Sequence, residues 1–271
     1  MTPANLPIAV FDSGVGGLTV LRALRAALPA EDFVYLGDTA RLPYGTKSAD
    51  TVSRYALQAS DALVARGAKC LVVACNTASS VAIPALAARF APLPVIGVIE
   101  PGAEAAVRAS VHGHVAVIAT EGTVRGGAYP RAIARIAPTV EVTQRACPLF
   151  VSLAEEGWTD GPIAEAIARR YLEPLFQGSD APDALLLGCT HFPALIAPIR
   201  GVVGPAIAIV DSAETTAAAT VARLASLGLT RAAGSGSVRL LATDGPERFA
   251  RVGSVFSGEP IAPTEVELVD L

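Results

Sequence analysis

The sequence predicts an α/β fold of two pseudo-symmetric domains, each with a mostly parallel sheet flanked by helices. Short apolar runs rich in β-branched residues alternate with longer amphipathic stretches along most of the 271 residues. This alternation is typical of βαβ units, in which helices cover both faces of a parallel sheet. The chain is also long for a single hydrophobic core, which favours two domains.

The expected strands are the short apolar runs, which end at glycine, proline or polar residues. They comprise residues 8–12, 33–37, 71–75, 94–98, 115–119, 140–144, 184–188, 206–210 and 237–244. Between them, apolar side chains recur with the period of about 3.6 residues that is typical of helices. The clearest of these stretches predict helices over residues 18–28, 49–67 and 162–176.

A weak internal repeat supports the division into two related domains. The stretch around Ser13 aligns with the stretch around Thr120, and the stretch around Cys75 aligns with that around Cys189. The alignment therefore pairs a hydroxyl with a hydroxyl and a thiol with a thiol.

The repeat and the order of the elements suggest where the domains begin and end. We expect a discontinuous first domain made of residues 1–97 and 211–271, and a second domain made of residues 98–210. The site of function should lie in the cleft between the two.

Composition excludes several classes of protein. Although 52% of the residues are hydrophobic, no apolar run approaches the roughly 20 residues that span a bilayer. The first residues show neither a basic leader nor a long apolar segment, which predicts a cytoplasmic protein. The net charge of −4 argues against a broad nucleic-acid surface, which needs clustered Lys and Arg.

The four cysteines show no CxxC motif, and a reducing compartment makes structural disulfides unlikely to form. Cys189 and His191 lie only two residues apart, and the chain contains no ligand pair with the spacing of a zinc finger. We therefore expect no metal site.

Small and hydroxyl-bearing residues gather where predicted strands end. In open α/β sheets this is where ligands bind, close to the N-termini of the following helices. The DSGVGG stretch is not a dinucleotide fingerprint, because Thr19 stands where the third glycine would be needed. Backbone N–H groups in such turns could hold an anionic ligand without arginine. The stretches comprise residues 12–17, 37–45, 74–79, 119–123 and 188–193.

Cys75 and Cys189 occupy equivalent places after two of these strands. A lone cysteine there would most simply be a small buried hydrophobe. A thiol at a helix N-terminus, however, is expected to have a lowered pKa and to form thiolate readily. Two matched thiols facing one cleft could remove a proton from one side of a carbon and return it to the other, as stereoinversion requires.

Other polar residues at these positions have simpler interpretations that the residues alone leave open. Asp12 and Asp38 could be ordinary capping or turn residues. Glu155 could be a solvated carboxylate near a helix end, and His191 could pack against or cap the helix after its strand.

Four motifs, in this order and spacing, resemble those of the bacterial glutamate racemases, cofactor-independent members of the aspartate/glutamate racemase family. The resemblance extends from Ile8 to about Leu224. The chain departs from the family at Phe192, where tyrosine is usual, and at Gly126, where serine is common. Neither position is a catalytic one. The motifs are DSGVGG (12–17), DTARLPYG (38–45), ACNTAS (74–79) and GCTHFP (188–193).

The resemblance implies a role for each matching residue. It makes Cys75 and Cys189 the two acid/base thiols, with Cys75 acting on the D-enantiomer and Cys189 on the L-enantiomer. Asp12 would assist Cys75, while His191 and Glu155 would assist Cys189, with the adjacent Glu156 as an alternative to Glu155. The implied substrate-binding residues are Asp12, Ser13, Tyr44, Gly45, Asn76, Thr77, Thr120, Thr123, Thr190 and His191.

The implied activity is the interconversion of L- and D-glutamate by two-base proton transfer, which would supply D-glutamate for peptidoglycan. No cofactor is expected, because no lysine occupies a comparable strand-end turn. We also expect a homodimer. The nearest alternative is a related two-cysteine racemase or isomerase acting on aspartate, a hydantoin or another small acid. A decarboxylase or a cysteine hydrolase would need one thiol, and a non-catalytic amino-acid-binding protein would need none.

Overall fold

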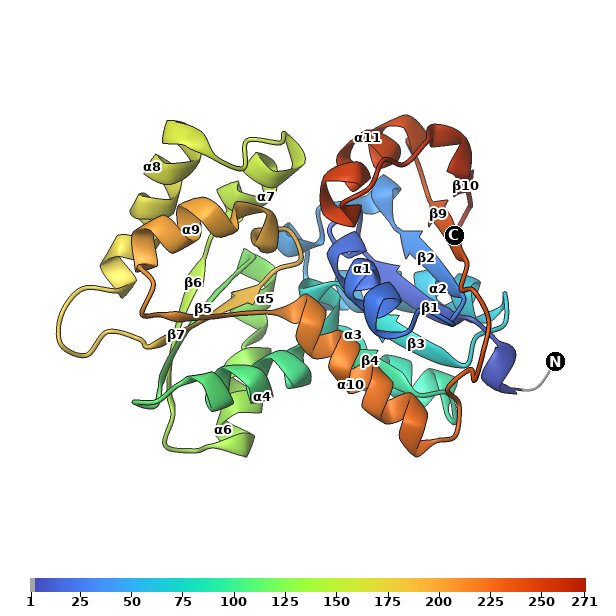
Figure 1. The fold of residues 1–271 in the computed structure, drawn as a ribbon, viewed down its shortest axis with the longest axis horizontal. Helices are drawn as coiled ribbons and strands as arrows, with labels where there is room; N and C mark the ends of the chain where they lie inside the picture. Colours follow the sequence, from blue (N-terminus) through green and yellow to red (C-terminus); the bar gives the residue numbers. More distant parts are fainter. Residues whose placement is uncertain (1–2) are drawn as a thin grey trace.

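The computed structural model describes residues 3–271 and contains two parallel sheets that lie side by side (Figure 1). The first sheet has six strands in the order β10-β9-β2-β1-β3-β4, and the second has four in the order β6-β5-β7-β8. Helices cover both sheets, which confirms the predicted α/β class. The strands are β1 (Ile8–Asp12), β2 (Phe33–Gly37), β3 (Cys70–Val73), β4 (Val95–Gly97), β5 (His114–Ala119), β6 (Glu141–Ala146), β7 (Ala184–Gly188), β8 (Ala208–Asp211), β9 (Val238–Ala242) and β10 (Val266–Leu268).

The two sheets share one topology. The order β2-β1-β3-β4 in the first sheet recurs as β6-β5-β7-β8 in the second, so β1 corresponds to β5 and β3 to β7. Ser13 and Thr120 directly follow β1 and β5. Cys189 directly follows β7, and Cys75 lies two residues beyond the end of β3. The weak repeat in the sequence is therefore a repeat of the fold.

The chain passes from the first sheet to the second and back. Strands β1 to β4 build the first sheet, β5 to β8 build the second, and β9 and β10 return to the first (Figure 1). The boundaries expected at residues 97/98 and 210/211 stay predictions. The first of them falls between β4 and α4, and the second falls inside β8.

Eleven α-helices and several short 3-10 helices connect the strands within residues 3–271. The α-helices are α1 (Leu18–Ala27), α2 (Ala49–Val64), α3 (Asn76–Phe90), α4 (Ile99–Ala109), α5 (Glu121–Gly126), α6 (Ala128–Ile136), α7 (Pro148–Glu155), α8 (Gly161–Leu172), α9 (Ile196–Val203), α10 (Ser212–Ser226) and α11 (Pro246–Ser257). The 3-10 helices are η1 (Pro3–Asn5), η2 (Thr39–Arg41), η3 (Tyr44–Thr46), η4 (Glu173–Leu175), η5 (Phe192–Leu195) and η6 (Pro263–Glu265).

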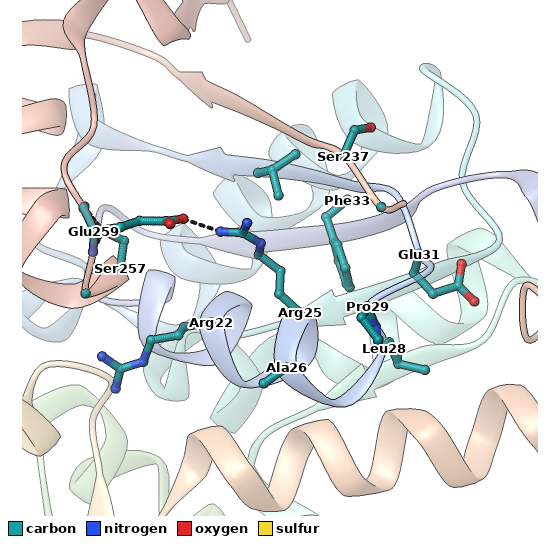
Figure 2. Close-up of a pocket in the computed structure, with 13 residues that line it drawn as sticks. Arg22, Arg25, Ala26, Leu28, Pro29, Glu31, Phe33, Ser237, Ser257 and Glu259 are labelled. Atoms are coloured by element: carbon teal, nitrogen blue, oxygen red, sulfur yellow. Dashed lines mark hydrogen bonds and ion pairs between the residues drawn. The ribbon is translucent and has the colours of Figure 1, made fainter. Parts of the chain in front are cut away.

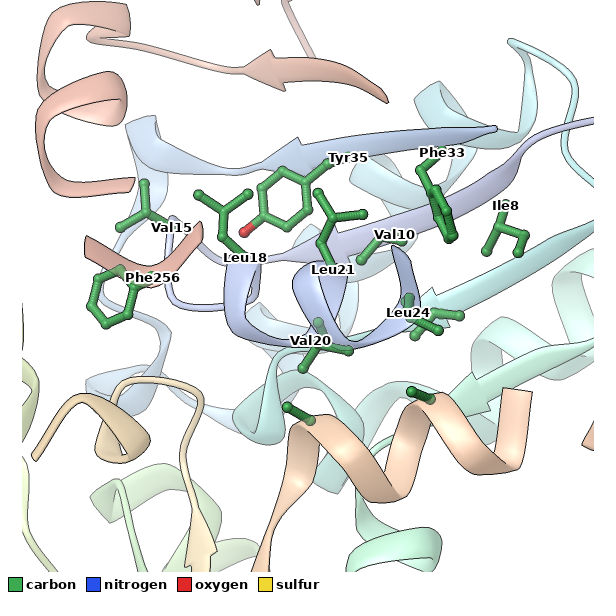
Figure 3. Packing of buried hydrophobic residues seen from close by; sticks show 14 of the residues in the cluster. Ile8, Val10, Val15, Leu18, Val20, Leu21, Leu24, Phe33, Tyr35 and Phe256 are labelled. Carbon is green, nitrogen blue, oxygen red and sulfur yellow. The ribbon is translucent and has the colours of Figure 1, made fainter. Parts of the chain in front are cut away.

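Each sheet is buried on both faces because successive side chains of a strand point in opposite directions. In β1, Ile8 and Val10 pack into one core with α1, α10 and α11, part of which Figure 3 shows. Ala9 and Phe11 pack into a second core with α2 and α3. The second sheet divides in the same way, with α7, α8 and α9 over one face and α4 and α6 over the other.

Several predicted elements end earlier than the apolar pattern suggests. β3 stops at Val73, because Cys75 already serves as the N-cap of α3. α2 ends at Val64, shortly before Gly67 turns the chain with a φ of +82°. α8 ends at Leu172 and continues as the 3-10 helix η4, which contains Pro174. Helix α11 and strand β10 were not predicted.

No helix within residues 3–271 is both long enough and apolar enough to cross a membrane.

A buried ion pair joins two segments that are far apart in the chain. It lies at the amino ends of the strands of the first sheet, whereas the thiols lie at the carboxyl ends. Lys69, 3% exposed, pairs with Glu31, 2% exposed, and also donates to the backbone oxygen of Ala4 at 2.6 Å. The second carboxylate oxygen of Glu31 accepts from the backbone N–H of Arg231 at 2.8 Å. Removing one partner of such a pair leaves the other charge buried and uncompensated.

We expect Lys69→Met to lower the free energy of unfolding by about 3–5 kcal/mol, because Glu31 then stays buried without its cation. Arg25→Met is the matched control. Arg25 pairs with Glu259 at the surface, where both side chains are about half exposed, and its loss should cost less than about 1 kcal/mol. Urea titrations followed by circular dichroism measure both values. Equal costs for the two variants would contradict this assignment.

Candidate active site

A pocket of about 240 Å³ lies between the two halves of the molecule, at the carboxyl ends of β1, β3, β5 and β7. This is the position where open parallel sheets bind ligands. The pocket contains every predicted site residue except Asp12 and Thr123, which lie directly behind its wall. Its lining residues are Ser13, Gly14, Leu42, Pro43, Tyr44, Gly45, Thr46, Cys75, Asn76, Thr77, Thr120, Glu121, Pro148, Val151, Ser152, Glu155, Cys189, Thr190 and His191.

A larger cavity of about 440 Å³ lies elsewhere, between α1 and the chain around β9 and the end of α11. Figure 2 shows its side chains, with Arg25 reaching across to Glu259. A second wall residue, Glu31, belongs to the buried ion pair with Lys69. Arg22 also lines this cavity, but the lining holds no cysteine or histidine, in contrast to the smaller pocket.

Cys75 lies on one wall of the pocket, at the N-terminus of the 15-residue helix α3. Its side chain is 5% exposed. The Sγ atom donates to Ser13 Oγ at 3.4 Å and accepts from the backbone N–H of Ala78 at 3.4 Å. The thiol is therefore held at the start of the helix with one face towards the pocket.

Cys189 lies on the other wall and has a different set of partners. Its Sγ atom lies 3.8 Å from Nδ1 of His191, and the opposite ring atom, Nε2, lies 3.2 Å from Oε1 of Glu155. Burial lowers the pKa of His191, but the hydrogen bonds and negative charges of Cys189 and Glu155 outweigh burial and raise it to about 10. At neutral pH the imidazole is therefore a cation in contact with Cys189 Sγ.

Glu155 acts as the anion of this group. Its burial would raise its pKa, yet the hydrogen bond and charge of His191 and those of Arg248 lower it below the usual value. Oε1 faces His191, while Oε2 accepts from Nη2 of Arg248 at 2.6 Å. The structure therefore brings Glu155, rather than the adjacent Glu156, into contact with His191.

The thiol of Cys75 has a higher pKa than the sequence led us to expect. A position at a helix N-terminus should lower the pKa, but burial and the nearby charge of Asp12 raise it to about 12. Desolvation of the thiolate outweighs the helix dipole in this enclosed wall. Burial also raises the pKa of Asp12, against the charge of His191 and the backbone hydrogen bonds that its carboxylate accepts. The expected thiolate at Cys75 is thus absent from the resting state.

Three threonine hydroxyls join the two halves at the floor of the pocket. Thr77 Oγ1 lies 2.9 Å from Thr120 Oγ1 and 3.3 Å from Thr123 Oγ1. Thr120 and Thr123 lie 3.0 Å from each other. Because hydroxyls can rotate to donate, this cluster could bind a carboxylate of a ligand.

Asn76 is fixed by its amide nitrogen and leaves its oxygen free. Nδ2 donates to Tyr129 OH at 2.8 Å and to Ser212 Oγ at 3.0 Å. Within residues 3–271, Oδ1 of Asn76 and Oδ1 of Asp12 are buried without a hydrogen-bond partner. Unpaired buried acceptors are costly, and Asn76 lines the pocket, so its oxygen is suited to receive a donor from a ligand, such as an ammonium group.

Asp38 fixes the segment that carries Tyr44 and Gly45. Its carboxylate is fully buried and accepts from Tyr44 OH, from Nε of Arg41 at 2.7 Å and from Thr243 Oγ1 at 3.0 Å. Sequence reasoning left Asp38 as a possible capping residue, but the structure makes it the anchor of a pocket wall.

Two glycines allow the halves to approach closely. A Cβ atom on Gly16 would lie 2.4 Å from both His191 Nδ1 and Thr190 Oγ1, and one on Gly45 would lie 2.8 Å from Thr120 Cβ. Any side chain at Gly16 would push the DSGVGG turn away from His191. The glycines of these motifs therefore serve contact between the halves, in addition to the turn itself.

Several residues of the pocket carried no sequence signal. Pro148, Val151 and Ser152 of α7 line the pocket, but their motif-free segment resembles any amphipathic helix. Arg248 lies in the tail beyond the recognised motifs. Within residues 3–271, no group of three or more His, Cys, Asp and Glu side chains is arranged to hold a metal ion.

The chain is similar to known racemases along most of its length. The model of the Asp/Glu/hydantoin racemase family matches residues 10–220. The glutamate racemase of Geobacter metallireducens is 52% identical over 252 residues, which cover 93% of this chain and 92% of that protein.

Solved structures show the same similarity. The crystal structure of the Thermus thermophilus glutamate racemase with β-chloro-D-alanine has a TM-score of 0.87 at 45% identity, covering 99% of this chain and 98% of that one. The Francisella tularensis glutamate racemase in complex with D-glutamate has a TM-score of 0.91 at 35% identity, with 98% of both chains covered.

The different surroundings of the two thiols predict different reactivity towards iodoacetamide. Cys189 should be alkylated faster at neutral pH, because its sulfur contacts the His191 imidazolium, whereas burial raises the pKa of Cys75 to about 12. Alkylation of Cys75 should accelerate about tenfold per pH unit, since its thiolate becomes populated only as the pH approaches its raised pKa. Peptide mass spectrometry over time measures both rates.

Cys70 and Cys147 provide internal controls, because both are fully buried and should stay unmodified. In His191→Asn, alkylation of Cys189 should slow towards the rate of Cys75. Equal rates with equal pH slopes for the two pocket thiols in the intact protein would refute the difference between them.

Proposed function

The chain belongs to the Asp/Glu/hydantoin racemase family and is an isomerase, and we propose that it interconverts L- and D-glutamate by proton transfer between two thiols without a cofactor. The observation that carries this proposal is the placement of Cys75 and Cys189 after equivalent strands, on opposite walls of one pocket. The relatives and solved neighbours named above, all glutamate racemases, support glutamate as the substrate.

The pocket suits a substrate of this size and charge. Its volume of about 240 Å³ lies below the range of about 300–1,000 Å³ that is usual for drug-sized ligands. The hydroxyls of Thr77, Thr120 and Thr123 can donate to a carboxylate. The free oxygen of Asn76, which lines the pocket, can accept from the ammonium group. These contacts would hold the α-carbon between the two sulfur atoms.

In the proposed mechanism, the Cys189 thiolate removes the α-proton of L-glutamate. The negative charge passes to the carbanionic intermediate, which the pocket hydroxyls and backbone N–H groups stabilise. The thiol of Cys75 then donates its proton to the opposite face and gives D-glutamate. Cys75 ends as thiolate and Cys189 as thiol, so a proton must return before the next turnover.

The surroundings of the thiols account for this resetting. The raised pKa of Cys75, about 12, favours recapture of a proton by its thiolate once the product leaves. His191 keeps its own proton up to about pH 10 and so remains a cation beside Cys189. For D-glutamate, Cys75 must first lose its proton. Asp12, whose charge acts on Cys75 and whose own carboxyl pKa is raised by burial, would assist this loss.

A direct assay tests the proposal. The purified protein is incubated in deuterated water with L-glutamate and, separately, with L-aspartate, both without cofactor. Loss of optical rotation together with deuterium at Cα of the glutamate product is expected. If aspartate is turned over faster, aspartate rather than glutamate is the substrate, and the proposed two-thiol chemistry still holds. No exchange with either acid would overturn the proposal.

The physiological role extends the proposal further. Supply of D-glutamate for peptidoglycan, a cytoplasmic location and a homodimer are predictions of the sequence. Depletion of the protein in its host, rescued by added D-glutamate, would test the first of them, and light scattering on the purified protein would test the last.

Replacing either pocket thiol should abolish racemisation in both directions, since a full turnover needs a base on each face. Cys75→Ala and Cys189→Ala should each lose at least about 10²-fold in kcat, the lower range for a general acid–base group. Cys70→Ala is the control, because Cys70 is buried in the core of the first sheet, away from the pocket. Residual activity above about a tenth of wild type in either pocket variant would exclude the two-base mechanism.

Substituting the assisting groups should affect the two directions differently. Asp12→Asn should lower kcat for D-glutamate more than for L-glutamate, because Asp12 acts on Cys75, and His191→Asn should do the reverse. The equilibrium fixes the ratio of the two kcat/KM values, so the difference must appear in kcat and KM separately. The measurement is kcat for each enantiomer, with α-deuterated substrate alongside. Identical losses and unchanged isotope effects would leave both residues as shared binding groups.

A further inference from the structure

One face of helix α11 makes two separate contacts with the group around Cys189. Arg248 and Phe256 lie eight residues apart, which places them on the same side of a helix. Arg248 donates to Glu155 Oε2 at 2.6 Å. The ring of Phe256 meets that of His191 edge-on, with centroids 4.9 Å apart. A helix of the first half thus contacts both partners of a thiol that belongs to the second half.

The contacts form a continuous chain from the surface to the thiol. Arg248, with a side chain 51% exposed, holds one oxygen of Glu155, and the other oxygen of Glu155 meets His191 Nε2. His191 in turn places Nδ1 3.8 Å from Cys189 Sγ. Since each oxygen of Glu155 has its own donor, the plane of the carboxylate is fixed by both of them.

The start of α11 is itself held in place. The segment before it exchanges two hydrogen bonds with η2, between Thr39 and Asp244, and Thr243 donates to Asp38 at 3.0 Å. Asp38 also holds Tyr44 of the pocket wall. Arg248 therefore stands on an element that is anchored to the pocket and is not a freely moving surface residue.

The family match ends at residue 220 and does not include α11. We propose that Arg248 is a positioning residue, which holds the carboxylate of Glu155 in the orientation that fixes His191 against Cys189. This inference rests on the proposed function, in which Cys189 is one of the two acid/base thiols. Without Arg248, the Glu155 side chain, which is 17% exposed, is free to rotate towards solvent.

The titration of His191 separates this role from a purely electrostatic one. The groups that face His191 are Cys189, Thr190 and Glu155, together with the charge of Asp12 and the ring of Phe256. Simple removal of a nearby positive charge would raise the pKa of His191. Loss of its fixed carboxylate partner would lower it. The two explanations thus predict shifts of opposite sign.

The experiment is a pH titration of the protein labelled with ¹⁵N-histidine, followed by NMR. The chain has three histidines, and His191→Asn identifies the signal of His191. We expect Arg248→Ala to lower the pKa of His191 from about 10. Arg248→Gln, which keeps a donor for Glu155 without the charge, should lower it less. An unchanged or raised pKa in Arg248→Ala would overturn the proposal.

Kinetics provide the second measurement. Arg248→Ala should lose about tenfold in kcat for L-glutamate, with a smaller change for D-glutamate, because a small displacement of an acid–base group is costly. Arg248→Lys should recover part of this loss. Arg251→Ala is the matched control, since Arg251 lies on the same helix, is exposed and has no ion-pair partner among residues 3–271. Equal losses for Arg248→Ala and Arg251→Ala would also overturn the proposal.

The NMR titration distinguishes failure of this inference from failure of the proposed function. If the intact protein does not racemise glutamate, the proposed function fails, yet the NMR titration still reports whether Arg248 fixes the partner of His191. If racemisation is present and the titration of His191 is unaffected by Arg248→Ala, only the positioning role is lost.

Discussion

The close approach of the two halves across the pocket is the constraint on which the rest of the site depends. A proton can leave one face of a carbon and return to the other only if two bases stand on opposite sides of a space one substrate wide. Here the DSGVGG turn approaches His191 so closely that a single Cβ atom on Gly16 would not fit. The hydroxyl cluster of Thr77, Thr120 and Thr123 joins the same two halves at the floor. Contact at both places sets the separation of the walls, and with it the reach of the thiols.

The two halves repeat the same fold, but the residues around their two thiols differ. Equivalent strands deliver Cys75 and Cys189 to equivalent places. Cys75 then meets a hydroxyl and a buried carboxyl, whereas Cys189 meets an imidazolium backed by Glu155. Cys189 therefore lies beside a positive charge, whereas the surroundings of Cys75 raise the pKa of its thiol. A perfectly symmetric pair of thiols would lack this difference.

Much of the fold and of the site could be predicted from the sequence because both depend on local patterns. Short β-branched runs mark strands that are buried on both faces, and the four motifs mark where those strands end. Features that depend on tertiary contacts could not be predicted from the sequence. The pKa of Cys75 was expected in the wrong direction, since the burial that raises it cannot be seen in the motif. Arg248 was missed because its partner lies 93 residues earlier in the chain. Asp38 was left open because its role lies in what it holds, Tyr44 and Thr243.

The return of the chain to the first sheet has a consequence for the order in which the protein is made. Strand β9 pairs with β2, while β10 and α11, which follow all the other strands in the chain, complete that half. All strands of the second sheet are synthesised before β9, so that half can fold first, as earlier parts of a chain generally do. Both thiols therefore exist in a growing chain well before the helix that supports Glu155 and His191. The contacts around Cys189 are completed only once α11 has been synthesised, so a chain truncated before α11 would keep both pocket cysteines but lack the contacts that Arg248 and Phe256 make with Glu155 and His191.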